Sequence, residues 1–236
     1  MRRITRYLAT FIYKPLLVKY LSKERPYSYK NIHLKIHPDV FHPGFFHSTK
    51  ILLHYLGSLS LRNKRFLELG AGSGLISIAA AKAGAVVTAS DINPVAIDYL
   101  RRNMQANSVS VNLAISDLFD DLPLQVFDLI VINPPYYFDS PRSFREHAWY
   151  CGKNGEYFQD LFHSLSNYCN STTVILMILC EGSNREAIRS IAGAHGFALT
   201  CVKEVQNLIE RNYVYRITMN DRVPVPLSGN EMNATV

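Results

Sequence analysis

Residues 65–76, RFLELGAGSGLI, decide the fold of this chain. An apolar run breaks into three closely spaced glycines and then resumes, which predicts a strand, a tight turn and the start of a helix. Because Gly70, Gly72 and Gly74 have no Cβ, the turn can adopt positive φ and a ligand can lie against bare backbone. The pattern predicts a cofactor-binding loop, although a plain strand-to-helix connection would also carry such glycines.

The acidic residue before the turn indicates the kind of cofactor. In the dinucleotide fingerprint the third glycine follows the second by three residues, whereas Gly74 follows Gly72 by two. Glu68 stands just ahead of the turn, where a carboxylate would repel a pyrophosphate and attract an ammonium group. The loop is therefore expected to bind a cofactor other than a dinucleotide.

Two downstream strands deliver polar residues to the same edge. The run AVVTASDINP places Asp91 at the end of a second parallel strand, where its carboxylate would meet the hydroxyls of a ribose. Asp91 would also serve as the N-cap of a helix that begins near Pro94. The run DLIVINPPY predicts a buried strand that must stop at its prolines, at the carboxyl edge where open α/β sheets bind ligands.

With these pieces the chain resembles the class I S-adenosylmethionine-dependent methyltransferases that carry an Asn-Pro-Pro-Tyr motif. That branch includes the HemK-like release-factor glutamine N5-methyltransferases, the adenine N6-methyltransferases and the guanine N2-methyltransferases of ribosomal RNA. The resemblance covers roughly residues 40–220, with its detailed match at residues 66–74, Asp91, Asp117 and residues 133–136. It implies an α/β fold with a Rossmann-like seven-stranded sheet flanked by helices.

The resemblance also implies a site. The expected cofactor-binding residues, for S-adenosyl-L-methionine, are Thr49, Glu68, Gly70, Ala71, Gly72, Gly74, Asp91, Ile92, Asp117, Leu118 and Asn133. The expected catalytic residues are Asn133, Pro134, Pro135 and Tyr136, and no metal is expected. The Asn133 side-chain oxygen and the Pro134 carbonyl would accept both N–H bonds of the target nitrogen, with Tyr136 lying on its flat group. The alternative for the motif is a turn after a strand.

Two cofactor contacts have local alternatives. Thr49, with Ser48, would touch the carboxylate end of the cofactor, although relatives usually carry an Asp near this point; either residue would also cap the helix that follows. Asp117 would accept from the adenine amino group, or would only form an Asx turn. His47 is expected to be a polar surface residue.

The organisation divides into three parts: residues 1–39 as an N-terminal helix and hairpin extension, residues 40–220 as the methyltransferase domain, and residues 221–236 as a disordered tail. An amphipathic N-terminal helix, interrupted at Pro15, would pack on the domain or serve as a membrane-surface or RNA-touching arm. Strands are expected at residues 85–90, 109–115, 173–180, 197–205 and 213–219, and helices at residues 75–83, 94–105, 155–167 and 184–195.

Composition restricts the class of protein. Its 236 residues are 48% hydrophobic and 19% charged, as in an ordinary globular protein with one large domain. Four cysteines without Cys-x-x-Cys spacing indicate reduced thiols in a cytoplasmic protein, not a zinc site or a disulfide framework. Targeting and membrane-spanning segments are not expected. The net charge of +6 would help with an anionic partner without proving one.

The long segment at residues 137–154 is rich in aromatics and arginines. This content predicts that the segment forms a wall of the acceptor pocket. The leading interpretation is an N-methyltransferase of a protein glutamine amide, with a translation release factor as acceptor. The rival is an RNA or DNA base N-methyltransferase acting on adenine N6 or guanine N2. A third possibility is a non-catalytic cofactor-binding partner, against which the intact motif and glycines argue.

Overall fold

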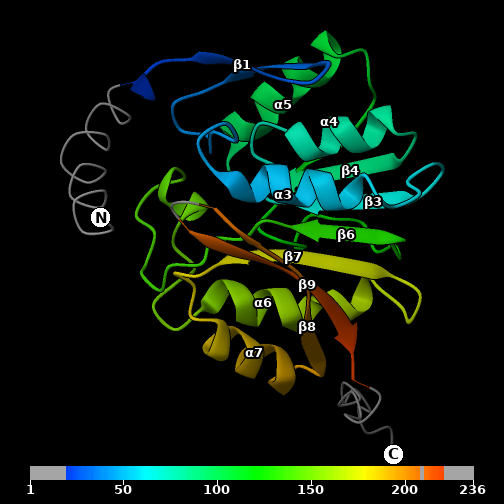
Figure 1. The fold of residues 1–236 in the computed structure, drawn as a ribbon, viewed down its shortest axis with the longest axis vertical. Coiled ribbons are helices and arrows are strands. Elements are labelled where there is room, and N and C mark those ends of the chain that lie inside the picture. The colour runs from blue at the N-terminus through cyan, green and yellow to red at the C-terminus, as the bar shows by residue number, and fades with distance from the viewer. Residues whose placement is uncertain (1–19, 208–209, 221–236) are drawn as a thin grey trace, which may run out of the picture.

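A computed structural model describes residues 20–207 and 210–220. Most of the expected N-terminal helix and the expected disordered tail at 221–236 lie outside these residues, and the three-part division of the chain stays a prediction. Within the described residues the chain forms one mixed sheet between two layers of helices, with a small hairpin at one side (Figure 1). The expected α/β fold with a seven-stranded sheet is confirmed.

The main sheet has the order β5-β4-β3-β6-β7-β9-β8. Its strands are β3 Arg65–Leu69, β4 Val86–Asp91, β5 Asn112–Ile115, β6 Leu129–Ile132, β7 Val174–Cys180, β8 Phe197–Gln206 and β9 Arg211–Met219. The first five strands in that order are parallel, and β9 runs antiparallel to both β7 and β8. The carboxyl ends of β3, β4 and β6 therefore meet at one edge.

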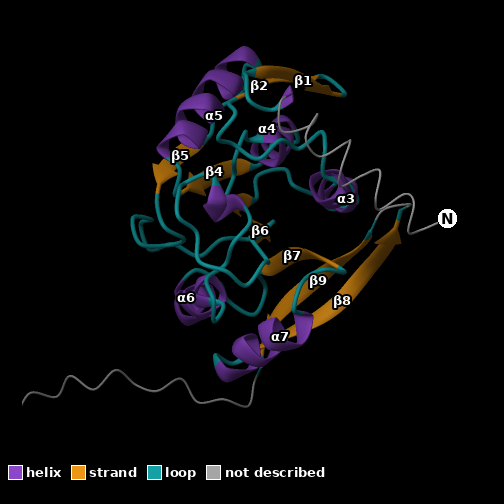
Figure 2. Cartoon of the chain, turned by 90° about the vertical axis from the view of Figure 1, so that its left-hand side faces the viewer, coloured by secondary structure: helices purple, strands orange, loops and turns teal. Residues whose placement is uncertain are grey.

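Both faces of the sheet are covered. The helices are α3 His47–Leu56, α4 Leu75–Lys82, α5 Pro94–Ala106, α6 Glu156–Ser164 and α7 Arg185–Ala194, with 3-10 turns at Glu146–Ala148 and Leu165–Asn167. One apolar core lies between the sheet and α3, α4 and α5, and the other lies between the sheet and α6 and α7 (Figure 2). Because each central strand contributes to both cores, these strands read as continuous apolar runs in the sequence.

The hairpin of β1 Arg25–Tyr29 and β2 Ile32–Ile36 belongs to the first core. Asn103 on α5 and Asn107, the C-cap residue of this helix, bind the free edge of β2 as a neighbouring strand would. The Asn103 amide accepts from Lys35 N at 2.8 Å and donates to Lys35 O at 3.0 Å. The Asn107 amide does the same with His33, at 3.1 Å and 2.7 Å. Two asparagines spaced one helical turn apart thus satisfy one edge of an exposed strand.

Several expected boundaries were wrong. The strand expected at 109–115 begins only at Asn112, because Val109 N donates to Met104 O at the end of α5. The helix expected at 155–167 ends as an α-helix at Ser164 and continues as a 3-10 turn. Asn93, rather than Asp91, caps α5: its side chain accepts from Val95 N at 3.0 Å.

Candidate active site

The glycine turn forms an open backbone cradle after β3. Gly70, Gly72 and Gly74 have φ of 70°, 53° and 84°, a region that L side chains rarely adopt. A Cβ on Gly70 would have no atom within 4 Å, and one on Gly72 would meet only Val40 Cγ1, at 3.8 Å. The space beside these two glycines is therefore free for a ligand that lies on the backbone.

Gly74 has a different task. A Cβ there would lie 1.9 Å from Leu100 Cδ1, so this glycine lets α4 pack closely against α5. Its place in the cofactor-binding set stays a prediction, because Gly74 does not line the pocket that contains the other expected residues.

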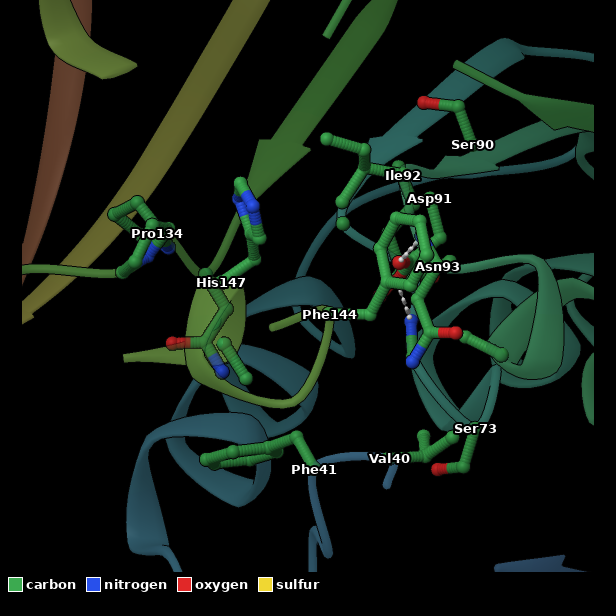
Figure 3. A pocket seen from close by; sticks show the side chains of 18 of the residues that line it. Val40, Phe41, Ser73, Ser90, Asp91, Ile92, Asn93, Pro134, Phe144 and His147 are labelled. Atoms are coloured by element: carbon green, nitrogen blue, oxygen red, sulfur yellow. Dashed lines mark hydrogen bonds between the residues drawn. The ribbon is translucent and has the colours of Figure 1, made fainter. Parts of the chain in front are cut away.

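That pocket opens at the carboxyl ends of β3, β4 and β6 (Figure 3). It brings together all the other residues expected from the sequence: Thr49, Glu68, Gly70, Ala71, Gly72, Asp91, Ile92, Asp117, Leu118, Asn133, Pro134, Pro135 and Tyr136. They come from the start of α3, the ends of three strands and the turn after β5. The cofactor loop and the Asn-Pro-Pro-Tyr motif therefore share one cavity.

Asp91 ends β4 and is fixed by backbone donors. Its Oδ2 accepts from Gly72 N at 2.8 Å, and its Oδ1 accepts from Asn93 N at 2.9 Å. Burial raises the pKa of this carboxyl, while these two bonds act in the opposite direction. Each carboxylate oxygen keeps a lone pair after these bonds, which two neighbouring hydroxyls could use.

Glu68 is buried on β3, with 4% of its surface exposed, and it accepts from the Ser77 hydroxyl on α4. Burial raises the pKa of Glu68 to about 8, the Ser77 bond opposes the rise, and the neighbouring Asp91 adds to it. A cation in the pocket would relieve that penalty by pairing with the carboxylate. The residue thus suits the ammonium group that its position in the sequence suggested.

Asp117 lies after β5 with an exposed side chain that lines the pocket. The turn here is held by Ser116, whose hydroxyl accepts from Asp121 N at 3.0 Å and donates to Leu118 O at 3.1 Å. Because the side chain that bonds to the backbone of this turn is Ser116 and not Asp117, the Asx-turn alternative for Asp117 is wrong. The Asp117 carboxylate makes no hydrogen bond within the described part of the chain, and burial raises its pKa.

Asn133 follows β6 and is held from the opposite side by α3. Its Nδ2 lies 3.2 Å from Ser48 Oγ and 3.5 Å from Thr49 Oγ1. The expected cap role of Ser48 or Thr49 is wrong, because α3 begins at His47 with Phe46 as its N-cap and no side-chain cap bond. Both hydroxyls are buried and turned to the site instead. His47 is exposed, as expected.

The segment at residues 137–154, which the sequence predicted as a wall of the acceptor pocket, contributes side chains to the lining of the cavity. Phe144 and His147, from the chain after β6, line the pocket (Figure 3). A charge on His147 would lower the pKa of both Asp91 and Asp117, so its ring lies within electrostatic reach of both carboxylates. The aromatic and basic content of residues 137–154 was the available signal, but it did not say which side chains face the pocket.

Three aromatic rings from distant segments form a cluster at the same cavity, which we call the aromatic wall: Phe41, Phe46 and Trp149. Ring centroids lie 4.6 Å apart for Phe41 and Phe46, 4.8 Å for Phe46 and Trp149, and 5.4 Å for Phe41 and Trp149. Phe41 and Trp149 line the pocket. No sequence signal identified Phe41, because its partner Trp149 lies far along the chain.

Other chemistry is limited in the described ranges. Residues 20–207 and 210–220 contain no group of three or more His, Cys, Asp or Glu side chains that could hold a metal ion. In the same ranges, no helix is long and apolar enough to cross a membrane. All four cysteines are free thiols.

Comparison with known proteins finds methyltransferases. The Methyltransferase small domain family matches residues 31–146. A protein of Methanocaldococcus jannaschii, named as a proposed protein N5-glutamine methyltransferase, is 37% identical over 155 residues, which cover 63% of this chain and 76% of the relative. The ribosomal protein L11 methyltransferase of Helicobacter hepaticus is 35% identical over 96 residues, and the match spans only 30% of that relative.

Solved structures share the fold at lower identity. The E. cuniculi Mtq2–Trm112 complex, responsible for methylation of the eRF1 translation termination factor, gives a TM-score of 0.59 at 20% identity, covering 77% of this chain and 99% of that one. A T. thermophilus 16S rRNA N2 methyltransferase, in complex with AdoMet and guanosine, gives 0.61 at 19% identity, covering 84% and 51%. The glycine cradle, the buried acid at Glu68 and the carboxylates of Asp91 and Asp117 in the same pocket fit the cofactor of that fold. The chain therefore belongs to the class I S-adenosylmethionine-dependent methyltransferases, and its residues 31–146 match the Methyltransferase small domain.

Proposed function

We propose that this enzyme methylates the side-chain amide nitrogen of a glutamine in a protein, with a translation release factor as the first candidate acceptor. The observation that carries the proposal is the placement of Asn133, with its two prolines and Tyr136, in the cavity that also contains the glycine cradle. The M. jannaschii relative named for glutamine N5 methylation supports the choice of nitrogen.

The reaction is a displacement at a methyl group. S-adenosylmethionine supplies an electrophilic methyl on a sulfonium; the acceptor nitrogen forms the new N–C bond, the S–C bond breaks, and a neutral thioether leaves. The methylated nitrogen, which is now positively charged, then loses one proton to water and becomes neutral. The chain therefore has to bind both reactants, orient the acceptor nitrogen toward the methyl group and stabilise the positive charge that develops on this nitrogen. It needs no covalent intermediate.

Asn133 and Pro134 would orient the nucleophile. An amide nitrogen is a poor nucleophile because its lone pair is delocalised into the carbonyl. If the Asn133 side-chain oxygen and the Pro134 carbonyl accept its two N–H bonds, the lone pair is directed at the methyl group. Both bonds strengthen as positive charge develops on nitrogen, so they lower the barrier more than they improve binding.

Tyr136 would cover the planar amide as a neutral phenol. Burial raises its pKa, and the nearby Cys180 thiol and Tyr137 act in the same direction. A neutral ring face offers packing without becoming a base at physiological pH. The aromatic wall lies across the same cavity and would exclude water from the other side of the acceptor side chain.

An RNA base is the second candidate acceptor, because two observations favour it. The net charge is +6, and the 16S rRNA N2 methyltransferase shares the fold. Residues 1–30 carry eight of the 25 Lys and Arg residues with one acidic residue, and the segment 142–150 also interleaves arginines with aromatics. The protein acceptor stays the first candidate because of the relative named for glutamine N5 methylation, at 37% identity.

Transfer of label from S-adenosyl-[methyl-³H]methionine in a cell lysate tests the proposal. We expect the purified enzyme to label a protein band that survives nuclease treatment and that yields N5-methylglutamine on digestion. An Asn133→Ala enzyme is the matched control for background labelling. Label that disappears with ribonuclease, or that is recovered as a methylated nucleoside, would show that the acceptor is an RNA base and would contradict the proposal.

A further inference from the structure

Two hydroxyls at the start of α3 do not perform the usual task of hydroxyls at a helix start. Phe46 occupies the N-cap position and makes no side-chain cap bond, although Ser48 and Thr49 follow directly. Both are buried, at 7% and 5% exposure, and both line the pocket. Their contact is with Asn133 Nδ2, at 3.2 Å from Ser48 Oγ and 3.5 Å from Thr49 Oγ1.

The orientation of the Asn133 amide decides whether that side chain can act. The amide presents an acceptor oxygen on one side and an NH₂ donor on the other, and its terminal torsion has two broad wells. With the oxygen toward the acceptor nitrogen, it accepts an N–H bond. With the amide turned over, two N–H groups face each other, and the attraction becomes repulsion.

A hydroxyl can donate or accept, so the contact with Ser48 does not fix the amide alone. A carboxylate in the pocket removes that ambiguity, because it accepts only and draws the hydroxyl protons to itself. The hydroxyl lone pairs then remain for Asn133 Nδ2, which leaves the Asn133 oxygen on the acceptor side. The cofactor carries such a carboxylate, and the start of α3 is where the family resemblance places it.

We propose that Ser48 is a positioning residue that holds the Asn133 amide with its oxygen toward the methyl acceptor. The shorter contact assigns this task to Ser48. Thr49 lies at the limit of hydrogen-bond distance from Asn133, and its hydroxyl instead contributes to the affinity for the cofactor by binding the cofactor carboxylate. The inference rests on the proposed catalytic role of Asn133, but it does not depend on whether the acceptor is a protein or an RNA.

The helix that carries Ser48 is rigidly placed. Ile51, Leu52 and Leu56 on its inner face are buried in the first core, and α3 packs against α4 and β7. A side chain on its first turn therefore keeps a fixed distance from the end of β6, where Asn133 lies. Such precision is needed, because a hydrogen bond weakens steeply with misalignment.

A pair of neighbouring variants tests the division of tasks. In Ser48→Ala, kcat should fall by about tenfold or more, while the Kd for the cofactor, measured by calorimetry, changes by less than about threefold. Ser48→Thr keeps the hydroxyl and should restore most of kcat. Thr49→Val is the contrasting variant and should weaken cofactor binding, and His47→Ala, exposed on the same helical turn and outside the pocket, is the matched control that should leave both kcat and Kd close to those of the wild type.

Two further measurements separate positioning from a merely structural role. In an Asn133→Ala background, Ser48→Ala should cause no additional loss of kcat, because the group that it positions is gone. In the ¹⁵N-labelled protein without cofactor, Ser48→Ala should shift the Asn133 side-chain NH₂ signals, which are assigned by their loss in Asn133→Asp. This second measurement does not require turnover.

The outcomes distinguish this inference from the proposed function. If Asn133→Ala leaves turnover intact, the catalytic role of Asn133 fails, and the inference with it. If Asn133→Ala slows turnover while Ser48→Ala does not, or acts equally in both backgrounds, only the positioning role of Ser48 is overturned. Weaker cofactor binding in Ser48→Ala, equal to that in Thr49→Val, would make Ser48 a cofactor contact instead.

Discussion

At the scale of single residues, Asn133 separates affinity from catalysis. Asn133→Ala should lower kcat by about a hundredfold or more, because the bond to the nitrogen strengthens only as charge develops there. The Kd of the cofactor should stay within a few fold. Steady-state kinetics together with calorimetry provide both values, and equal losses in the two would place Asn133 among the cofactor contacts.

Asp91 has a structural and a ligand-binding task, and both should be visible. Asp91→Ala should weaken the cofactor by roughly 2 kcal/mol or more, since two charge-assisted bonds to ribose hydroxyls are lost. It should also reduce the free energy of unfolding, because Gly72 N and Asn93 N lose their acceptor. Asn93→Ala is the comparison variant: it removes the helix cap and the Nδ2 bond to Asp39 O at 3.0 Å, so it should reduce the free energy of unfolding by about 1–2 kcal/mol, while the Asp91 carboxylate for the ribose hydroxyls is kept.

Glu68 should make the stability of the cofactor-free protein depend on pH. Its pKa is about 8 in the fold, against 4.5 for an exposed glutamate. Above pH 4.5 the unfolded chain releases this proton while the folded protein retains it, so stability decreases as pH rises toward 8. Glu68→Gln should remove this decrease, worth up to about 3 kcal/mol at pH 7. Urea unfolding at pH 5, 6 and 7 measures the slope, and parallel slopes for both proteins would contradict the prediction.

The same residue should couple cofactor binding to proton release. The cofactor's ammonium favours the Glu68 carboxylate, so affinity should rise between pH 6 and 7.5 in the wild type and change little in Glu68→Gln. Calorimetry in buffers of different ionisation enthalpy counts the protons released. A wild-type affinity that does not change over this range would show that the ammonium lies elsewhere.

At the scale of elements, the hairpin of β1 and β2 depends on two side chains of α5. Asn103 is buried, and it also donates to Ser73 O at 3.0 Å, behind the glycine turn. Asn103→Ala leaves Lys35 N and Lys35 O without partners and should cost about 2–3 kcal/mol of unfolding free energy. Urea unfolding checks this, with Asn112→Ala on the exposed side of β5 as a control that should change stability by less than about 0.5 kcal/mol.

The elements that the sequence predicted well are those whose signals are local. Residues 65–76 combine an apolar strand with its glycine turn, and β3 and α4 form close to the expected boundaries. Predictions failed where a distant partner competed. Val109 reads as a strand residue, yet its N–H is bound by the end of α5. Ser48 reads as a helix cap, yet its hydroxyl contacts Asn133 instead.

At the scale of the whole molecule, salt dependence should report the kind of acceptor. A protein acceptor that inserts one glutamine side chain should bind mainly through apolar and backbone contacts, so its KM should change by only a few fold between 50 and 200 mM salt. An RNA acceptor would release counterions from its phosphates, and KM would rise steeply. Initial rates over this salt range make the distinction, and Arg142→Gln and Arg145→Gln should flatten the slope only in the RNA case.

The fold was predictable, and so was the placement of Glu68, Asp91 and Asp117 beside one pocket, because these residues lie at the ends of neighbouring strands in the sheet. The acceptor side was predictable only at Asn133–Tyr136. The aromatic wall joins Phe41 and Phe46 to Trp149, and no periodicity links segments so far apart. Such a surface is assembled only in the fold, and the linear pattern does not encode it.

The segment between β6 and α6 leaves and rejoins the molecule at nearly one place. Tyr137 N donates to Trp149 O at 3.0 Å, Cys151 N donates to Tyr137 O at 2.9 Å, and Gly152 N donates to Asp139 O at 2.9 Å. These bonds close the base of the excursion, so its interior can change without altering the strand before it or the helix after it. Under the proposed function, replacement of this one segment would change the side chains that meet the acceptor while β6 and α6 keep their places.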